Sequence, residues 1–175
     1  MQYITASLEL ELMTNKPMFN KLAILLVGAQ NTGKTSTLRE YCEYYENITL
    51  GSRFRKGWRW QVAPFRPNYS LIKTPAYFVQ SSPTESAKPL ADSIDPLGWF
   101  PDLLFVAEQL NGQQYTNTVT YLRANDYHIK EFVLSDTNGI DIWDRWRTNA
   151  EKDTKLLYRR EAIADYIRNF ILSKI

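Results

Sequence analysis

The sequence predicts an α/β fold, a three-layer sandwich with a mainly parallel sheet, and two observations support this prediction. Short runs of apolar residues with the length of core strands recur along the chain, at residues 22–27, 75–80, 103–108 and 129–134. Segments with apolar residues at helical spacing separate or follow these runs. Strands that alternate with helices form parallel sheets covered by helices on both faces.

The first strand and the segment after it carry the strongest pattern in the chain. Residues 22–27 read LAILLV, as expected for a strand buried on both faces. After Lys34 the period changes, because Leu38, Tyr41, Cys42 and Tyr45 recur at the spacing of a helix. The residues between strand and helix, GAQNTGKT, fit the pattern G-x-x-x-x-G-K-[ST].

Each fixed residue of this pattern suits the binding of a polyphosphate for a chemical reason. A loop that wraps a polyphosphate turns backbone N–H groups inward, and Gly28 and Gly33 allow the close approach that a side chain would block. The helix that follows adds the positive end of its dipole. Lys34 supplies a full positive charge, and the hydroxyl of Thr35 suits a Mg²⁺ ion.

These residues resemble the Walker A motif of the P-loop NTPase superfamily. The resemblance implies that Lys34 acts on the β and γ phosphates of a nucleoside triphosphate and that Thr35 coordinates Mg²⁺. The expected nucleotide-binding residues are Gly28, Ala29, Gln30, Asn31, Thr32, Gly33, Lys34, Thr35 and Ser36. GTP is disfavoured because residues 135–138, SDTN, do not match the N-K-x-D motif usual in GTPases. ATP is therefore the expected nucleotide.

The third strand ends in a carboxylate where the resemblance calls for a Walker B motif. If the pattern is a run of apolar residues followed by Asp-Glu, Ala107 takes the place of the metal-binding aspartate and Glu108 that of the catalytic base. If one acid suffices, Glu108 alone fills the role. Glu108 is thus the candidate metal and catalytic carboxylate, and a plain carboxylate at a strand end is the alternative.

Arginines follow the fourth strand, in the segment WDRWR at residues 143–147. The resemblance to small P-loop kinases places Arg145 and Arg147 on a lid that stabilises the transferred phosphoryl group. The alternative is a solvated helix whose arginines pair with Asp144, Glu151 or Glu161. No fifth strand is expected after this segment, although kinases normally have one.

Residues 53–62 predict a basic β-hairpin inserted after the first helix. Arg53, Arg55 and Arg59 alternate with aromatic residues, and the chain can return antiparallel along residues 71–73. One interpretation is a cationic ribbon that binds a phosphorylated substrate or a nucleic acid. The other is an edge hairpin whose arginines discourage aggregation.

The polar segment after the second strand, SSPTES at residues 81–86, has two interpretations. Strand ends in open α/β sheets face the ligand crevice, so Ser81, Ser82 and Thr84 are candidates for a second set of site residues. Serine and proline followed by glutamate also suit the start of a helix, and this segment can be a turn and helix cap instead.

Length and composition fit one domain. The chain has 175 residues, of which 44% are hydrophobic and 23% charged, with a net charge of +2. Residues 1–20 are expected to be an N-terminal extension that is disordered, with an amphipathic edge strand around residues 8–12 as the alternative. Residues 21–175 are expected to be a single P-loop NTPase-like domain. The single cysteine, the lack of an apolar run that spans a bilayer and the acidic N-terminal segment predict a cytoplasmic protein without a membrane partner.

The sequence therefore predicts Mg²⁺-dependent binding of a nucleoside triphosphate, with hydrolysis expected. Two alternatives remain open. One is a phosphotransferase acting on a nucleotide or small metabolite. The other is a nucleotide-binding or nucleic-acid-associated module that does not hydrolyse its ligand, which is consistent with Ala107 at the possible Walker B aspartate.

Overall fold

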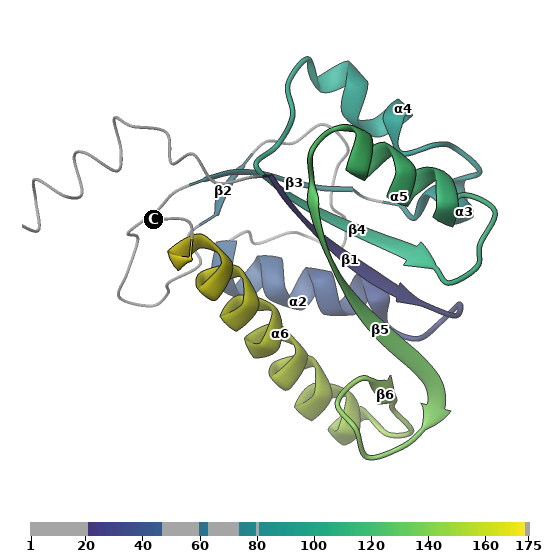
Figure 1. Ribbon diagram of the computed structural model, residues 1–175. Coiled ribbons are helices and arrows are strands. Elements are labelled where there is room, and N and C mark those ends of the chain that lie inside the picture. The colour runs from purple at the N-terminus through teal and green to yellow at the C-terminus, as the bar shows by residue number, and fades with distance from the viewer. Residues whose placement is uncertain (1–20, 47–59, 63–73, 80, 174–175) are drawn as a thin grey trace, which may run out of the picture.

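The computed structural model describes residues 21–46, 60–62, 74–79 and 81–173. Strands and helices alternate along most of this length, as the apolar runs predict (Figure 1). The elements are β1 (Leu22–Gly28), α2 (Lys34–Glu46), β2 (Trp60–Val62), β3 (Thr74–Phe78), α3 (Pro83–Ser86), α4 (Ala91–Ile94), the 3₁₀ helix η1 (Asp95–Leu97), β4 (Leu103–Gln109), α5 (Tyr115–Ala124), β5 (His128–Asn138), β6 (Asp144–Arg145) and α6 (Asn149–Leu172).

The strands form one sheet in the order β2-β3-β4-β1-β5-β6. Within the described residues, β3, β4, β1, β5 and β6 run parallel, and β2 pairs antiparallel with β3 at one edge. The strand β1 lies in the middle, hydrogen-bonded to β4 on one side and to β5 on the other. The expected mainly parallel sheet is confirmed.

Alternate residues of β1 face two separate apolar cores. Leu22, Ile24 and Leu26 belong to the core that contains side chains of α2 and α6. Residues Ala23, Leu25 and Val27 belong to the core on the opposite face, with side chains of α4 and α5. Because side chains of a strand alternate between faces, this division shows that the sheet is covered on both sides.

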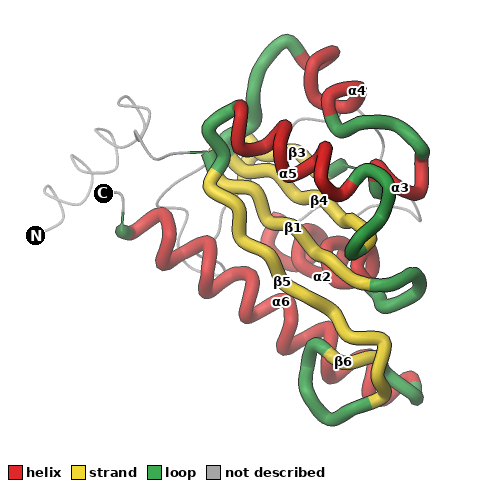
Figure 2. Tube along the Cα trace, turned by 45° about the vertical axis from the view of Figure 1, so that its right-hand side comes forward, coloured by secondary structure: helices red, strands yellow, loops and turns green. Residues whose placement is uncertain are grey.

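The helices follow the same division in space. Figures 1 and 2 show α2 and α6 on one face of the sheet and α3, α4 and α5 on the other. In α2 the residues at helical spacing, Leu38, Tyr41, Cys42 and Tyr45, are buried in the core. The structure therefore has the three layers that the sequence predicts.

The structure differs from the prediction after the fourth strand. The strand β5 continues to Asn138, beyond the expected end at residue 134. Asp144 and Arg145 then form β6, a short parallel strand beside β5, in a segment where helix was expected. This strand is only two residues long and depends on pairing with distant residues, so local sequence does not indicate it.

The predicted basic hairpin lies mostly outside the described residues. Residues 53–59 and 71–73, including Arg53, Arg55 and Arg59, are not described, so a substrate or nucleic-acid role for them stays a prediction. The described part, β2, pairs with β3 itself, with Trp60 opposite Ala76 and Val62 opposite Thr74. Residues 1–20 also lie outside the described residues.

The central position of β1 predicts a large cost for truncating its side chains. The side chain of Ile24 is fully buried in the core that contains side chains of α2 and α6. We expect Ile24→Ala to lower the free energy of unfolding by about 2–5 kcal/mol, because it removes buried methyl groups and leaves a cavity. Urea denaturation followed by circular dichroism measures this loss.

The matched control is Val133→Ala on β5, where the side chain is 51% exposed. This change is expected to cost less than about 1 kcal/mol. Equal costs at the two positions would contradict the burial pattern of the sheet.

Candidate functional site: the glycine loop and its cavity

The segment that joins β1 to α2 lies at the edge of the sheet where the parallel strands end. The chain places β4 on one side of β1 and then crosses over to place β5 on the other side. Open α/β sheets bind ligands at such a point, because loops leave the sheet in opposite directions and open a crevice. Residues 29–33, which connect the two elements, lie at this crevice.

The backbone of this loop has a shape that glycine permits. Gly33 has a φ of 87°, and Asn31 before it has a φ of 61°. At Gly28 a β-carbon would lie 2.8 Å from the carbonyl oxygen of Leu134 on β5 and 2.8 Å from the hydroxyl of Thr32. Thr32 fastens the loop from within by donating its hydroxyl to the carbonyl of Ala29 at 2.9 Å.

The first turn of α2 presents backbone N–H groups beside the loop. Its first helical hydrogen bond within the described residues runs from the N–H of Thr37 to the carbonyl of Gly33, at 2.9 Å. The N–H groups of residues 34–36 precede this bond, as expected at a helix N-terminus. They are therefore available to an anion, together with the positive end of the helix dipole.

Lys34 folds back into the loop and is almost completely buried. Its side-chain amine donates to the carbonyls of Ala29 (2.7 Å) and Gly28 (3.2 Å), and the residue is 5% exposed. Burial lowers the pKa of the Lys34 amine from its ordinary value, and the carboxylates of Glu85 and Glu108 oppose this shift. A cation in this setting attracts an anion more strongly than one in open solvent.

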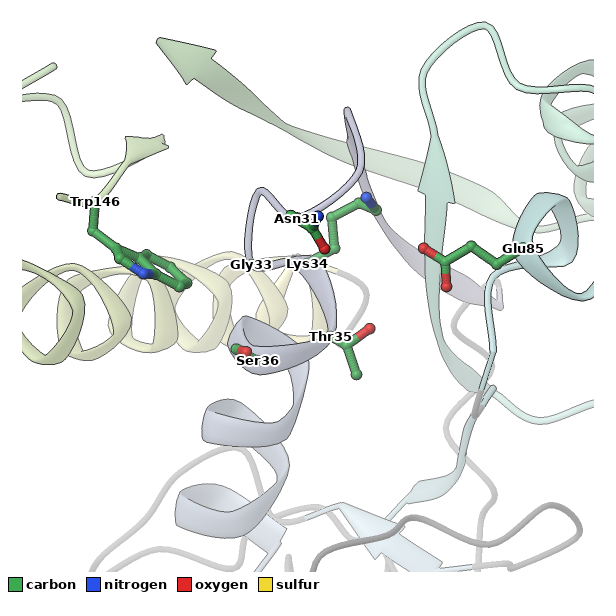
Figure 3. A pocket seen from close by; sticks show the side chains of 7 residues that line it. All are labelled: Asn31, Gly33, Lys34, Thr35, Ser36, Glu85 and Trp146. Atoms are coloured by element: carbon green, nitrogen blue, oxygen red, sulfur yellow. The ribbon is translucent and has the colours of Figure 1, made fainter. Parts of the chain in front are cut away.

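A cavity of about 380 Å³ opens beside the loop (Figure 3). Its volume lies within the range usual for small-molecule sites. Five of the nine residues expected to bind nucleotide are among those that line it: the lining comprises Asn31, Gly33, Lys34, Thr35, Ser36, Glu85 and Trp146. The other four, Gly28, Ala29, Gln30 and Thr32, form the frame of the loop.

The two sides of the cavity differ in chemistry. In Figure 3 the hydroxyl of Thr35 and the carboxylate of Glu85 point toward one another on one side of the loop. Trp146 lies on the other side, where its ring meets Gly33. The site thus has a charged, oxygen-bearing side and an aromatic side, separated by the glycine loop.

Two buried cations of α6 hold the segment that carries Trp146. Lys155 donates to the carbonyls of Gly139 (2.7 Å), Asp144 (3.2 Å) and Arg145 (3.1 Å). Arg159, which is fully buried, donates to the carbonyls of Ile142 and Asp144. These bonds satisfy backbone carbonyls of β6 and of the loop before it.

Arg159 also connects this segment to the glycine loop. One guanidinium nitrogen donates to the hydroxyl of Thr37 at 3.2 Å, and that hydroxyl donates to the carbonyl of Gly33 at 2.8 Å. The guanidinium lies 5.3 Å from the centre of the Trp146 ring, within the range of a cation–π contact. Burial lowers the pKa of Arg159 to about 10, so the side chain is charged at neutral pH.

Glu108, the candidate metal and catalytic carboxylate, does not line the cavity. It is fully buried at the end of β4 and accepts hydrogen bonds from the hydroxyls of Ser82 (2.9 Å) and Thr118 (3.0 Å). The backbone N–H groups of Thr84 (3.3 Å) and Gln109 (2.9 Å) donate to it as well. The carboxylate therefore ties β4 to α3 and α5 in this conformation.

The residues after β3 start a helix. Ser82 is the N-cap of α3, Pro83 is the first helical residue, and the serine hydroxyl accepts a weak hydrogen bond from the N–H of Glu85 at 3.5 Å. The interpretation of this segment as a turn and helix cap is confirmed. Its effect on the site is indirect, because the helix places Glu85 at the cavity.

Arg145 and Arg147 are not among the residues that line the cavity. Arg145 is exposed on β6, and Arg147 forms an ion pair with Glu151 at 3.4 Å. The structure thus places neither side chain at the cavity, and the lid role implied by the resemblance stays a prediction. Pairing of Arg147 with Glu151 was the alternative, although β6 and a loop carry the two arginines instead of a helix.

Sequence reasoning missed Glu85, Trp146, Lys155 and Arg159. A short helix and an irregular loop carry the first two, and neither has a periodic pattern that marks it. Lys155 and Arg159 lie four residues apart on α6, hence on one face of that helix. That spacing was the available signal, because two cations on the side of a helix that also faces the sheet indicate buried partners.

Comparison with protein-family models, with curated proteins and with solved structures found no match. The described part of the chain holds no helix long and apolar enough to cross a membrane. It also holds no group of three or more His, Cys, Asp or Glu residues arranged for a metal ion. A Mg²⁺ ion bound with a nucleotide needs no such group, because phosphates and water supply most of its ligands.

The contact between Gly33 and Trp146 predicts a steric coupling. A β-carbon at Gly33 would lie 2.1 Å from the nearest atom of the Trp146 ring. We expect Gly33→Ala to cost about 1 kcal/mol for its positive φ and about 1–3 kcal/mol more for the clash. Urea denaturation of this variant, with and without Trp146→Ala, separates the two parts.

Gly98→Ala is the matched control, because Gly98 has a φ of 70° and no atom near its β-carbon position. It carries the cost of φ alone. The contact is disproved if Gly33→Ala costs no more than Gly98→Ala, or if its cost is unchanged when Trp146 is alanine.

Proposed function

We propose that this chain binds a nucleoside triphosphate, expected to be ATP, together with Mg²⁺ at the glycine loop. The observation that carries the proposal is the convergence of Lys34, the N–H groups of α2 and a cavity on one strand-to-helix loop. Each of these features favours a polyphosphate, and together they match what the resemblance to P-loop NTPases implies.

The residues at the cavity fit a nucleotide-bound Mg²⁺ ion. The Thr35 hydroxyl and the Glu85 carboxylate lie on the same side of the loop (Figure 3), and Mg²⁺ prefers oxygen ligands of this kind. Such an ion would supply charge neutralisation for the phosphates. In our proposal Thr35 contacts the ion, Glu85 orients its water shell and Lys34 moves from the loop carbonyls to the phosphates.

A thermal-shift panel tests the binding. With nucleotide and Mg²⁺ at about 100 times the dissociation constant, the melting temperature is expected to rise by about 5–10 °C. Lys34→Ala is expected to abolish this rise, because the variant lacks the charge within the loop. Comparing ATP with GTP, each with and without Mg²⁺, reports base preference and metal dependence.

Lys88→Ala is the control, because Lys88 is exposed and does not line the cavity. It should retain the full shift. The melting temperature of Lys34→Ala without ligand shows whether the variant is folded. A wild-type chain that no nucleotide stabilises would refute the proposal.

Hydrolysis of the bound nucleotide is part of the proposal, and binding without hydrolysis is the second candidate. The burial of Glu108 favours the second candidate, because four protein groups donate hydrogen bonds to this carboxylate and it does not line the cavity. Glu85 is the carboxylate that lines the cavity and can act on a water molecule there.

Phosphate release from ATP distinguishes the two candidates. If Glu85 acts on the attacking water, Glu85→Gln is expected to lower the rate about 100-fold or more while the nucleotide-induced thermal shift remains. Glu108→Gln is expected to lower stability, because one carboxylate oxygen becomes an amide donor facing the donors of Thr118 or Ser82.

A wild-type chain that binds ATP and releases no phosphate establishes the second candidate. Loss of release in Glu108→Gln with release retained in Glu85→Gln would instead restore Glu108 as the catalytic carboxylate.

A further inference from the structure

The aromatic side of the cavity has no role in holding phosphates. Trp146 is the one aromatic residue among the described residues that line the cavity, and it lies across the loop from Glu85 (Figure 3). A triphosphate needs cations, N–H groups and a metal ion, and these are supplied by Lys34, α2 and the Thr35 side. The indole ring must therefore serve another part of a ligand, or only the packing of the loop.

The indole ring has the surroundings of a stacking surface. It is half-buried, and the Arg159 guanidinium lies 5.3 Å from its centre. Lys152 places its amine 5.9 Å from the same centre. The quadrupole of an aromatic ring attracts such cations, which helps to hold the ring in place, and nucleobases stack on the faces of aromatic side chains.

The segment that carries the ring is fastened before any ligand arrives. Lys155 and Arg159 bind the backbone carbonyls around residues 139–145, and Arg159 reaches Gly33 through Thr37. A side chain that is already positioned loses little conformational freedom on binding. The ring is thus held in a fixed place relative to the glycine loop.

The position of the ring also matches the direction of a nucleotide. If the terminal phosphate faces Thr35 and Glu85, the other end of the ligand extends past Ser36 toward Trp146. The cavity, at about 380 Å³, has room for more than a phosphate chain. A flat aromatic group at that end would meet the indole ring.

We propose that Trp146 is the platform on which the base of the bound nucleotide stacks, so that the site selects a nucleoside triphosphate over inorganic polyphosphate. This inference rests on the proposed function and names the part of the ligand that the aromatic side recognises. Stacking does not depend on hydrogen bonds to the base edge, so the platform favours purines over pyrimidines by area alone.

The test compares ATP with inorganic tripolyphosphate, each with Mg²⁺, by isothermal titration calorimetry. Both ligands carry the phosphate chain, and only ATP carries a base. Trp146→Leu keeps an apolar side chain without a π surface. It is expected to weaken ATP binding about 5- to 150-fold and to leave tripolyphosphate binding unchanged.

Two further variants serve as controls. Trp146→Tyr restores an aromatic ring and is expected to recover most of the ATP affinity. Trp143→Leu is the matched control, because Trp143 also lies near Arg159 but stacks on Phe132 and does not line the cavity. It is expected to leave the affinity ratio of ATP to tripolyphosphate at the wild-type value.

The outcomes separate this inference from the proposed function. Equal weakening of both ligands by Trp146→Leu overturns the platform and assigns the ring to the packing of the loop. An unchanged ATP affinity overturns it as well. A wild-type chain that binds tripolyphosphate as tightly as ATP leaves the phosphate site standing without a base platform. A wild-type chain that binds neither ligand refutes the proposed function itself.

Discussion

The structure around the site depends on buried cations that donate hydrogen bonds to backbone carbonyls of the segments beside it. Lys34 does this for the glycine loop, and Lys155 and Arg159 do it for the segment between β5 and α6. Burying an unpaired carbonyl costs free energy, and burying an unpaired cation costs more. Each cation and its carbonyls offset the desolvation of the other, so the glycine loop and the segment around β6 keep defined shapes.

This arrangement links two parts of the chain that are far apart in sequence. Thr37 on α2 accepts from Arg159 on α6 and donates to the carbonyl of Gly33. The glycine loop therefore shares hydrogen bonds with the segment that carries Trp146, and both rest on the same pair of helices. A ligand at the glycine loop would therefore contact residues from near the start of the described chain and from the segment that precedes α6.

The carboxylates divide between structure and site. Glu108 is fully buried and receives donors from three elements, which makes it a junction between β4, α3 and α5. One consequence is the placement of α3, whose first turn brings Glu85 to the cavity. Glu108 thus affects the cavity through the helix α3 that it positions, while Glu85 is the carboxylate that lines the cavity.

The sequence by itself determined the layers and the position of the loop. The apolar runs of β1 and β4, the helical spacing in α2 and the two glycines are local patterns. They predict structure because side chains face the core with a period of two in a strand and 3.6 in a helix. Hence the sheet, the glycine loop and the helix after it could be predicted from the sequence.

Only the tertiary structure decided which side chains meet at the cavity. Glu85 and Trp146 reach it from opposite sides of the glycine loop (Figure 3), from a four-residue helix and an irregular loop whose placement depends on Glu108, Lys155 and Arg159. Arg145, Arg147 and Glu108, which the sequence had suggested for the site, do not line the cavity in the tertiary structure. The physical reason is that a buried charge takes its partners from whichever segments the fold brings near it, and a local pattern does not encode contacts such as that between Thr37 and Arg159, 122 positions apart.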